Sequence, residues 1–185
     1  MTYVERYRKE FLELAKVYGE LFSKCLSRKL GAVIVTPDGT IVATGYNGPP
    51  RGVPHCNSPI RLEQITNLYC KNFNRGDLVT LFSNYAGLEC PRHYLGFSSG
   101  EALSLCQAGH AERNCLINVS REGYSVKGCI LFVSCKGIPC APCAVEIINA
   151  GITSVINFLG KDYDKDARYL FNQAMVKIGK EINNA

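Results

Sequence analysis

The sequence has no apolar stretch that approaches the roughly 20 residues of a membrane-spanning helix. Its first residues, Met1–Arg6, lack the apolar core of a signal peptide. Lysine and arginine form no run of five or six, so the net charge of +5 suits a phosphate-bearing small substrate as well as a solvated basic surface. We therefore expect a cytoplasmic protein that does not cross a membrane, and we do not expect nucleic acid as its partner.

Cysteine, in contrast, is abundant, with ten residues in a chain of 185. A chain of this length buries roughly two-thirds of its unfolded surface and needs no disulfides to fold. Without an export signal, metal ligation explains many cysteines better than disulfides do. Some of them are ordinary core thiols, and Cys129, directly before the apolar run Ile130–Val133, is an example.

Hydrophobic periodicity predicts an α/β fold in a single domain that spans residues 1–185. A first amphipathic helix is predicted over Val4–Cys25, with Phe11, Leu14, Ala15, Tyr18, Leu21 and Phe22 at helical spacing. A hairpin of strands 31–35 and 40–44 follows, turning at Pro37-Asp38-Gly39. Helices at 109–121, 140–150 and 164–175 then alternate with strands at 128–134, 152–158 and 176–182. This alternation indicates a layered sheet whose later strands are parallel.

Residues 47–100 interrupt this pattern with a long irregular segment that includes a short helix near 60–73. Loops of this length are uncommon in small domains unless they are functional or held in place. Cys56, Cys70 and Cys90 lie within the segment, which suggests that a metal ion pins it.

The strongest chemical signal combines His110-Ala111-Glu112 with Pro139–Cys143, in which Cys140 and Cys143 are three residues apart. Catalytic zinc commonly takes three protein ligands and leaves one position for water, and His110, Cys140 and Cys143 supply three. At a helix N-terminus, both thiols also favour their ionised form. Alone, the two cysteines would fit a structural zinc site or a redox pair as well as they fit a catalytic site.

Glu112 is better placed beside the metal than on it, because it lies two residues after His110. Zinc lowers the pKa of bound water, and a neighbouring carboxylate can accept the proton and return it to the substrate. The arrangement H-x-E…P-C-x-x-C is typical of zinc deaminases that act on cytosine or adenine. Glu112 is therefore the predicted catalytic residue.

Several motifs together resemble the deoxycytidylate (dCMP) deaminase family within the cytidine deaminase superfamily. They are Ser23–Ile34, Thr44–Pro49, His55-Cys56, His110–Asn114 and Pro139–Cys143. The resemblance implies a three-layer α-β-α fold with a central five-stranded mixed sheet, and hydrolysis of dCMP to dUMP, which feeds thymidylate synthesis. It also implies a homo-oligomer, often a hexamer, that responds to dCTP and dTTP.

The same resemblance assigns roles to individual residues. Asn47 would bind the sugar, the backbone of Ala111 would meet the base carbonyl, and Tyr163 would lie near the nucleotide. Arg28 or Lys29 would bind the 5′-phosphate, unless they form only an exposed basic turn. The residues that would serve regulation are Tyr46, Gly48 and Arg121.

A second, structural zinc is a further implication, because some relatives use one to tie the long loop to the body. Its ligands here would be Cys25, Cys56, Cys90 and Cys106, with His93 as the alternative to Cys90. The segment Ser134–Pro139 is longer than the usual link before the cysteine pair, which affects the predicted base pocket. Cys135 in this link is either a pocket residue or a thiol at the end of a strand.

Two other functions remain compatible with the sequence. The chain could deaminate another cytosine or modified-cytosine nucleotide, such as 5-methyl-dCMP, or a nucleoside, guanine or tRNA adenine. It could also be an inactive zinc-binding nucleic-acid module, although a structural zinc does not need the proton shuttle that Glu112 provides.

Overall fold

The computed structural model of the chain describes residues 2–73, 84–98, 100–159, 162 and 164–180. The chain forms two compact units. The sheet unit comprises residues 1–23, 29–47 and 110–185, and the loop unit comprises residues 24–28 and 48–109. The loop unit contains most of the segment expected as an insertion at 47–100, and a single domain over 1–185 stays a prediction. Among the helices of the described residues, none combines the length and the apolar character that crossing a bilayer requires.

The sheet unit is built on a five-stranded mixed sheet with the strand order β2-β1-β3-β4-β5. The strands are β1 Gly31–Val35, β2 Ile41–Tyr46, β3 Ile130–Val133, β4 Ser154–Asn157 and β5 Lys177–Lys180. β1 pairs antiparallel with both β2 and β3, whereas β3, β4 and β5 run parallel. The predicted hairpin and the predicted parallel arrangement of the later strands are both confirmed.

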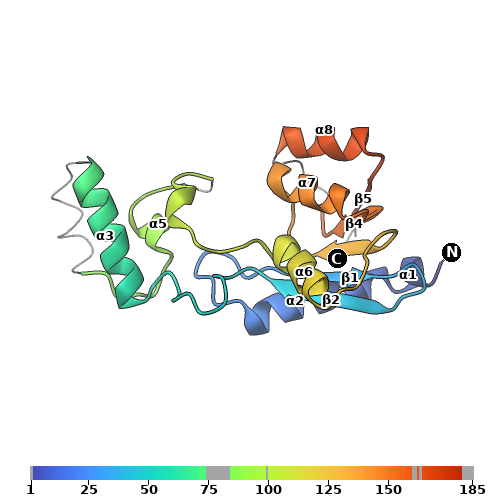
Figure 1. Cartoon of the computed structure of the whole chain (residues 1–185), viewed down its shortest axis with the longest axis horizontal. Helices are drawn as coiled ribbons and strands as arrows, with labels where there is room; N and C mark the ends of the chain where they lie inside the picture. Colours follow the sequence, from blue (N-terminus) through green and yellow to red (C-terminus); the bar gives the residue numbers. More distant parts are fainter. Residues whose placement is uncertain (1, 74–83, 99, 160–161, 163, 181–185) are drawn as a thin grey trace. The chain divides into compact units, whose positions relative to one another are not determined.

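Helices cover both faces of this sheet, as Figure 1 shows for α2 on one side and for α7 and α8 on the other. The helices are α1 Tyr3–Arg6, α2 Arg8–Phe22, α6 Ala111–Arg121, α7 Ala141–Asn149 and α8 Lys165–Gln173. Alternate residues of a strand face opposite sides of a sheet. Accordingly, Val33 and Phe132 pack with α2, whereas Ile34 and Leu131 pack with α6, α7 and α8.

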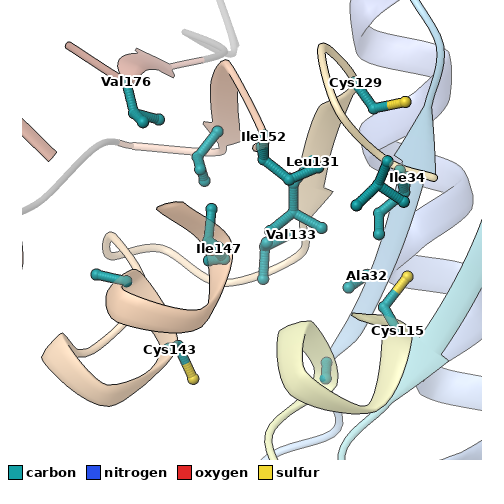
Figure 2. Packing of buried hydrophobic residues seen from close by; sticks show 14 of the residues in the cluster. Ala32, Ile34, Cys115, Cys129, Leu131, Val133, Cys143, Ile147, Ile152 and Val176 are labelled. Carbon is teal, nitrogen blue, oxygen red and sulfur yellow. The ribbon is translucent and has the colours of Figure 1, made fainter. Parts of the chain in front are cut away.

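The larger core cluster lies on the side of α6, α7 and α8. Figure 2 shows Leu131 and Val133 of β3 in this cluster, with Ile147 of α7 on one side and Ile34 of β1 on the other. Cys129 belongs to the same cluster and is buried, as expected for a core thiol. This packing fixes α6 and α7 against the sheet, and the candidate site lies at the N-termini of these two helices.

The N-terminal helix differs from the prediction in two ways. It is broken at Tyr7 and ends at Phe22 rather than at Cys25. Its buried residues are Phe11, Leu12, Ala15 and Gly19, whereas Leu14, Leu21 and Phe22 of the predicted face are exposed. The close approach of α2 to β1 explains this rotation, because a Cβ on Gly31 would lie 1.9 Å from the Ala15 carbonyl oxygen. At Gly31 of β1, only the small residues Ala15 and Gly19 of α2 fit against the strand.

The loop unit contains α3 Pro59–Phe73, which confirms the predicted short helix, together with α5 Pro91–Tyr94 and the 3-10 helix η1 Leu103–Leu105. Two buried arginines satisfy carbonyl groups of its irregular backbone. Arg61 Nη2 donates to the Leu105 carbonyl at 3.1 Å, and Arg92 Nε donates to the Glu101 carbonyl at 2.8 Å. These bonds tie the backbone at Leu105 to α3 and the backbone at Glu101 to α5.

Candidate active site

Two helix N-termini of the sheet unit bring three potential metal ligands together. His110 is the N-cap residue of α6, Cys140 is the N-cap residue of α7, and Cys143 lies in the first turn of α7. His110 Nδ1 lies 3.4 Å from Cys140 Sγ and 3.4 Å from Cys143 Sγ. All three ligand atoms lie within 4.8 Å of one another. The sequence motif therefore corresponds to one compact cluster in space.

The geometry and chemistry of this cluster fit a zinc ion. Tetrahedral zinc with ordinary Zn–N and Zn–S bond lengths requires about 3.6 Å between a nitrogen and a sulfur ligand, close to the 3.4 Å observed here. Hydrogen bonds from Cys143 and His110 lower the pKa of Cys140 to about 4. The hydrogen bond between His110 and Cys140 in turn raises the pKa of His110. These contacts favour a thiolate at Cys140, whereas the hydrogen bond with Cys140 and burial raise the pKa of Cys143, so ligation of zinc by both sulfurs would release a proton from Cys143.

Glu112 lies beside this cluster and is the second residue of α6. Its side chain is only 5% exposed. Burial raises the pKa of its carboxyl group above the ordinary value, because a desolvated carboxylate is disfavoured relative to the neutral acid. Glu112 does not belong to the set of three ligand atoms, so the arrangement provides a proton-carrying group next to a metal site.

Contacts that the sequence motifs did not reveal hold the two helices in place. Arg113 on α6 makes a bidentate ion pair with Glu146 on α7, at 3.0 Å from Nε to Oε2 and 2.8 Å from Nη2 to Oε1. The Asp164 carboxylate accepts a hydrogen bond from the backbone N–H of Ala141 at 2.8 Å. Arg113 lies in the motif His110–Asn114, but its partner Glu146 and the acceptor Asp164 belong to no motif with the ligands, and both contacts arise from tertiary packing.

The link before the cysteine pair is also anchored. Buried Asn157, at the end of β4, donates from Nδ2 to the Gly137 carbonyl at 3.1 Å. Cys135 donates from its thiol to the same carbonyl at 2.6 Å. The Cys135 thiol is therefore hydrogen-bonded within the link itself.

Asn47 is buried directly after β2, and its side chain is oriented by two donors. Its Oδ1 accepts hydrogen bonds from the Leu30 backbone N–H and from the Ser23 hydroxyl, each at 2.8 Å. Ser23 is fully buried and was not identified as a site residue from the sequence. Because Oδ1 accepts both bonds, these contacts fix the orientation of the Asn47 amide, and Nδ2 lies on its other side.

The other predicted nucleotide-binding and regulatory residues are distributed over both units. In the sheet unit, Ala111 begins α6, Arg121 ends it, and Lys29 is exposed. Tyr46 is partly exposed at the end of β2, where its ring lies 6.0 Å from that of Phe22. In the loop unit, Arg28 is exposed and Gly48 pairs with Gly109. Tyr163 lies outside the described residues.

The four cysteines of the predicted second zinc site all belong to the loop unit. Burial raises the pKa of Cys56 to about 11, and Coulombic repulsion from Cys90, Cys25 and Cys106 contributes to this rise. The four thiols therefore lie close enough to interact electrostatically. Within the described residues, the ligand atoms that lie within 4.8 Å of one another are those of His110, Cys140 and Cys143. The four cysteines of the loop unit do not meet this spacing. His93, the alternative ligand, has its Nε2 3.3 Å from Ser27 Oγ.

Comparison of the sequence with known proteins identifies named relatives. Deoxycytidylate deaminase of Schizosaccharomyces pombe is 29% identical over 172 residues, which are 93% of this chain and 43% of that protein. Deoxycytidylate deaminase of Enterobacteria phage T2 is 30% identical over 156 residues, 78% of this chain and 74% of that protein. The chain spans less than half the length of the fission-yeast relative and of the Saccharomyces cerevisiae relative, 43% and 42% respectively.

Comparison of structures supports the fold. The dCMP deaminase of cyanophage S-TIM5, solved in complex with dCMP and dUMP, superposes with a TM-score of 0.61 at 21% identity, over 95% of this chain and 96% of that one. Its apo form gives a TM-score of 0.60. Residues 5–159 of the sequence match the family described as the cytidine and deoxycytidylate deaminase zinc-binding region, and the chain therefore belongs to this family.

Proposed function

We propose that this chain is a zinc-dependent deaminase that hydrolyses dCMP to dUMP and ammonia. The observation that carries this proposal is the cluster of His110, Cys140 and Cys143 with the buried carboxylate of Glu112 beside it. The names of the relatives, deoxycytidylate deaminase, support the substrate. The product would supply thymidylate synthesis.

The residues of the site divide the chemistry between them. His110, Cys140 and Cys143 would hold the zinc, which supplies the Lewis acidity that makes water nucleophilic at neutral pH. Glu112 would accept a proton from the attacking water and deliver it to N3 of the base. As the C4–N bond breaks, a second proton passes through the same carboxylate to the leaving ammonia. A carboxyl group with a raised pKa suits such a double role.

Substrate binding would use groups around the start of α6. Ala111 is its first residue, where the backbone N–H has no acceptor within the helix and is directed outward, so it can donate to the base carbonyl. The orientation of Asn47 by Ser23 and Leu30 supports a role in binding the sugar. Arg28 or Lys29 would bind the 5′-phosphate, and Tyr163 would contact the nucleotide.

We also propose that the loop unit binds a structural zinc through Cys25, Cys56, Cys90 and Cys106. Four thiolates are a common ligand set for structural zinc, and the electrostatic effect of the other three on Cys56 supports their proximity. Because the four do not meet the spacing of the first site, metal binding would draw them closer together. We favour Cys90 over His93 as the fourth ligand because the charge of Cys90 acts on Cys56.

We further propose that the chain assembles into a homo-oligomer, such as a hexamer, and that dCTP and dTTP regulate it. Leu14, Val17, Leu21 and Phe22 expose an apolar surface along α2, which is a feature of protein interfaces. Tyr46 packs against Phe22 beside this surface. Tyr46, Gly48 and Arg121 would take part in effector binding, and of these Tyr46 lies next to an apolar surface available for subunit contact.

Ammonia release from a panel of cytosine compounds tests the proposed activity. The zinc-loaded protein is incubated with dCMP, CMP, deoxycytidine and 5-methyl-dCMP. We expect dCMP to react with the highest kcat/KM, and deoxycytidine to react poorly because it lacks the phosphate. Preference for 5-methyl-dCMP would assign the activity to a modified nucleotide, while absence of ammonia from every compound would favour the inactive zinc-binding module. Lack of reaction with dCMP in a zinc-loaded protein refutes the proposal.

A further inference from the structure

The side chain of Asp164 bonds to the first turns of two helices at once. Its Oδ2 accepts a hydrogen bond from the Ala141 N–H of α7 at 2.8 Å, and its Oδ1 accepts one from the Ala167 N–H of α8 at 3.0 Å. Asp164 is the N-cap residue of α8. Its bond to α7, in contrast, joins residues 23 positions apart in the sequence.

The acceptor for the Ala141 N–H comes from outside α7, and the N-cap side chain of α7 makes no capping bond of its own. The first backbone N–H groups of a helix have no intrahelical partner, and the N-cap side chain usually accepts from one of them. In α7 the N-cap residue is Cys140, which makes no side-chain capping bond. Its sulfur instead lies 3.4 Å from His110 Nδ1. Asp164 thus satisfies a helix end whose own cap residue is committed to the metal site.

The start of α8 carries further contacts beside Asp164. Arg168, one turn into α8, donates from Nε to Asp162 Oδ1 at 2.7 Å, which ties Asp162 to the helix. The hydrogen bonds from Ala141 and Ala167 lower the pKa of Asp164, so the carboxylate is the form present at neutral pH. A fixed, charged acceptor therefore faces the N-terminus of α7.

We propose that Asp164 is a positioning residue for the zinc ligands Cys140 and Cys143. Ala141 lies between the two cysteines, and its N–H is the backbone group that Asp164 holds. Fixing this group fixes the first turn of α7, and with it both sulfur atoms relative to His110. Outer contacts that orient metal ligands typically contribute about 10- to 100-fold to metal affinity. The inference rests on the proposed zinc at His110, Cys140 and Cys143.

Asp164→Asn tests the proposal by separating the two hydrogen bonds. Asparagine is as good an N-cap as aspartate, so its Oδ1 still accepts from Ala167 and keeps α8 capped. The amide group at the position of Oδ2 cannot accept from Ala141. We expect Asp164→Asn to melt near the wild-type temperature but to bind zinc about 10-fold or more weakly, as measured by competition with a chromogenic chelator. Asp164→Ala, which loses both bonds, should weaken zinc binding at least as much and should also lower the melting temperature.

Two reference variants define the result. His110→Ala removes a ligand of this site. The zinc uptake and the visible cobalt spectrum that this variant loses are therefore the part that belongs to the site. Thr2→Ala removes a capping bond of α1 and should lower stability without changing that part. In Asp164→Asn, the cobalt spectrum of the His110-dependent site should shift because the sulfur positions change. Wild-type zinc affinity and an unshifted spectrum in Asp164→Asn would overturn the inference. A wild-type protein with no His110-dependent zinc would instead overturn the proposed function.

Discussion

Glu112 and Asp164 are two carboxyl groups associated with the helices that carry the metal ligands, and their surroundings give them opposite protonation tendencies. Burial raises the pKa of Glu112, whereas backbone hydrogen bonds from Ala141 and Ala167 lower that of Asp164. At Glu112 burial outweighs the backbone hydrogen bond and the charge of His110, which act in the opposite direction, whereas at Asp164 the backbone donors favour the anion. Glu112 is therefore suited to carry a proton, and Asp164 to remain a permanent acceptor.

Replacing Glu112 with glutamine should separate metal binding from catalysis. The amide fills nearly the same buried space but cannot carry the proton, so we expect Glu112→Gln to retain the wild-type zinc content. Its kcat with dCMP should fall by about 100-fold or more, which is the typical contribution of general acid–base catalysis. Steady-state kinetics and metal analysis on the same preparation measure both quantities. Full turnover in a zinc-loaded Glu112→Gln protein would show that the mechanism is wrong.

The three residues of the ligand cluster and Glu112 could be predicted from sequence because they lie in two short motifs of fixed spacing. His110 and Glu112 are two residues apart, and Cys140 and Cys143 are three apart. The residues that position them could not be found in this way. Asp164 reaches α7 only because α8 packs beside α7, and Asn157 reaches Gly137 only through the sheet. The sequence does signal Asp164 as the start of a helix, but the second bond is a product of tertiary structure.

At the scale of elements, sequence periodicity predicted the helices and strands of the sheet unit, but only part of the buried face of the first helix, namely Phe11 and Ala15. Leu14 and Leu21 fit the expected apolar stripe, yet Leu12 is the leucine that is fully buried. Periodicity records the positions of large apolar residues. It does not record that the backbone of α2 lies so close to β1 that a side chain at Gly31 would not fit. The rotation of α2 follows from this steric condition between two elements.

Alanine substitutions of two leucines on α2 distinguish the two faces. Leu12 is 0% exposed and Leu21 is 64% exposed. We expect Leu12→Ala to lower the free energy of unfolding by about 2–5 kcal/mol because it leaves a cavity. Leu21→Ala, the matched control on the same helix, should change it by about 0.5 kcal/mol or less. Urea denaturation measures both values. A larger loss for Leu21→Ala than for Leu12→Ala would contradict the structure.

The contact between β2 and α6 gives a second prediction at this scale, because it depends on the absence of a side chain at Gly45. A Cβ there would lie 2.4 Å from the Cys115 backbone nitrogen and 2.6 Å from the Ala111 carbonyl oxygen. We expect Gly45→Ala to destabilise the protein by about 1–3 kcal/mol through overpacking. Gly123→Ala is the control, since its Cβ meets no atom within 4 Å and its cost comes only from a φ of +75°. Equal wild-type stability for Gly45→Ala in thermal unfolding would refute this close packing.

At the scale of the whole molecule, the cysteines divide between the two compact units. Cys140 and Cys143 lie in the sheet unit, whereas Cys25, Cys56, Cys90 and Cys106 lie in the loop unit. The sheet unit has an extensive apolar core. In the described part of the loop unit, the buried arginines Arg61 and Arg92 bind carbonyl groups of the backbone. Metal should therefore matter for chemistry in the first unit and for folding in the second.

Metal analysis of single-site variants tests this division. We expect about two zinc ions per chain in the wild type and about one in either His110→Ala or Cys56→Ser, because each variant removes one ligand set. Cys129→Ser, which alters a buried thiol outside both sets, should keep the wild-type content. Limited proteolysis should cut Cys56→Ser within residues 48–109 faster than wild type, since structural zinc contributes directly to folding, while His110→Ala should keep this segment protected. An unchanged zinc content and digestion pattern in Cys56→Ser would eliminate the structural zinc and leave the loop unit stabilised by its hydrogen bonds alone.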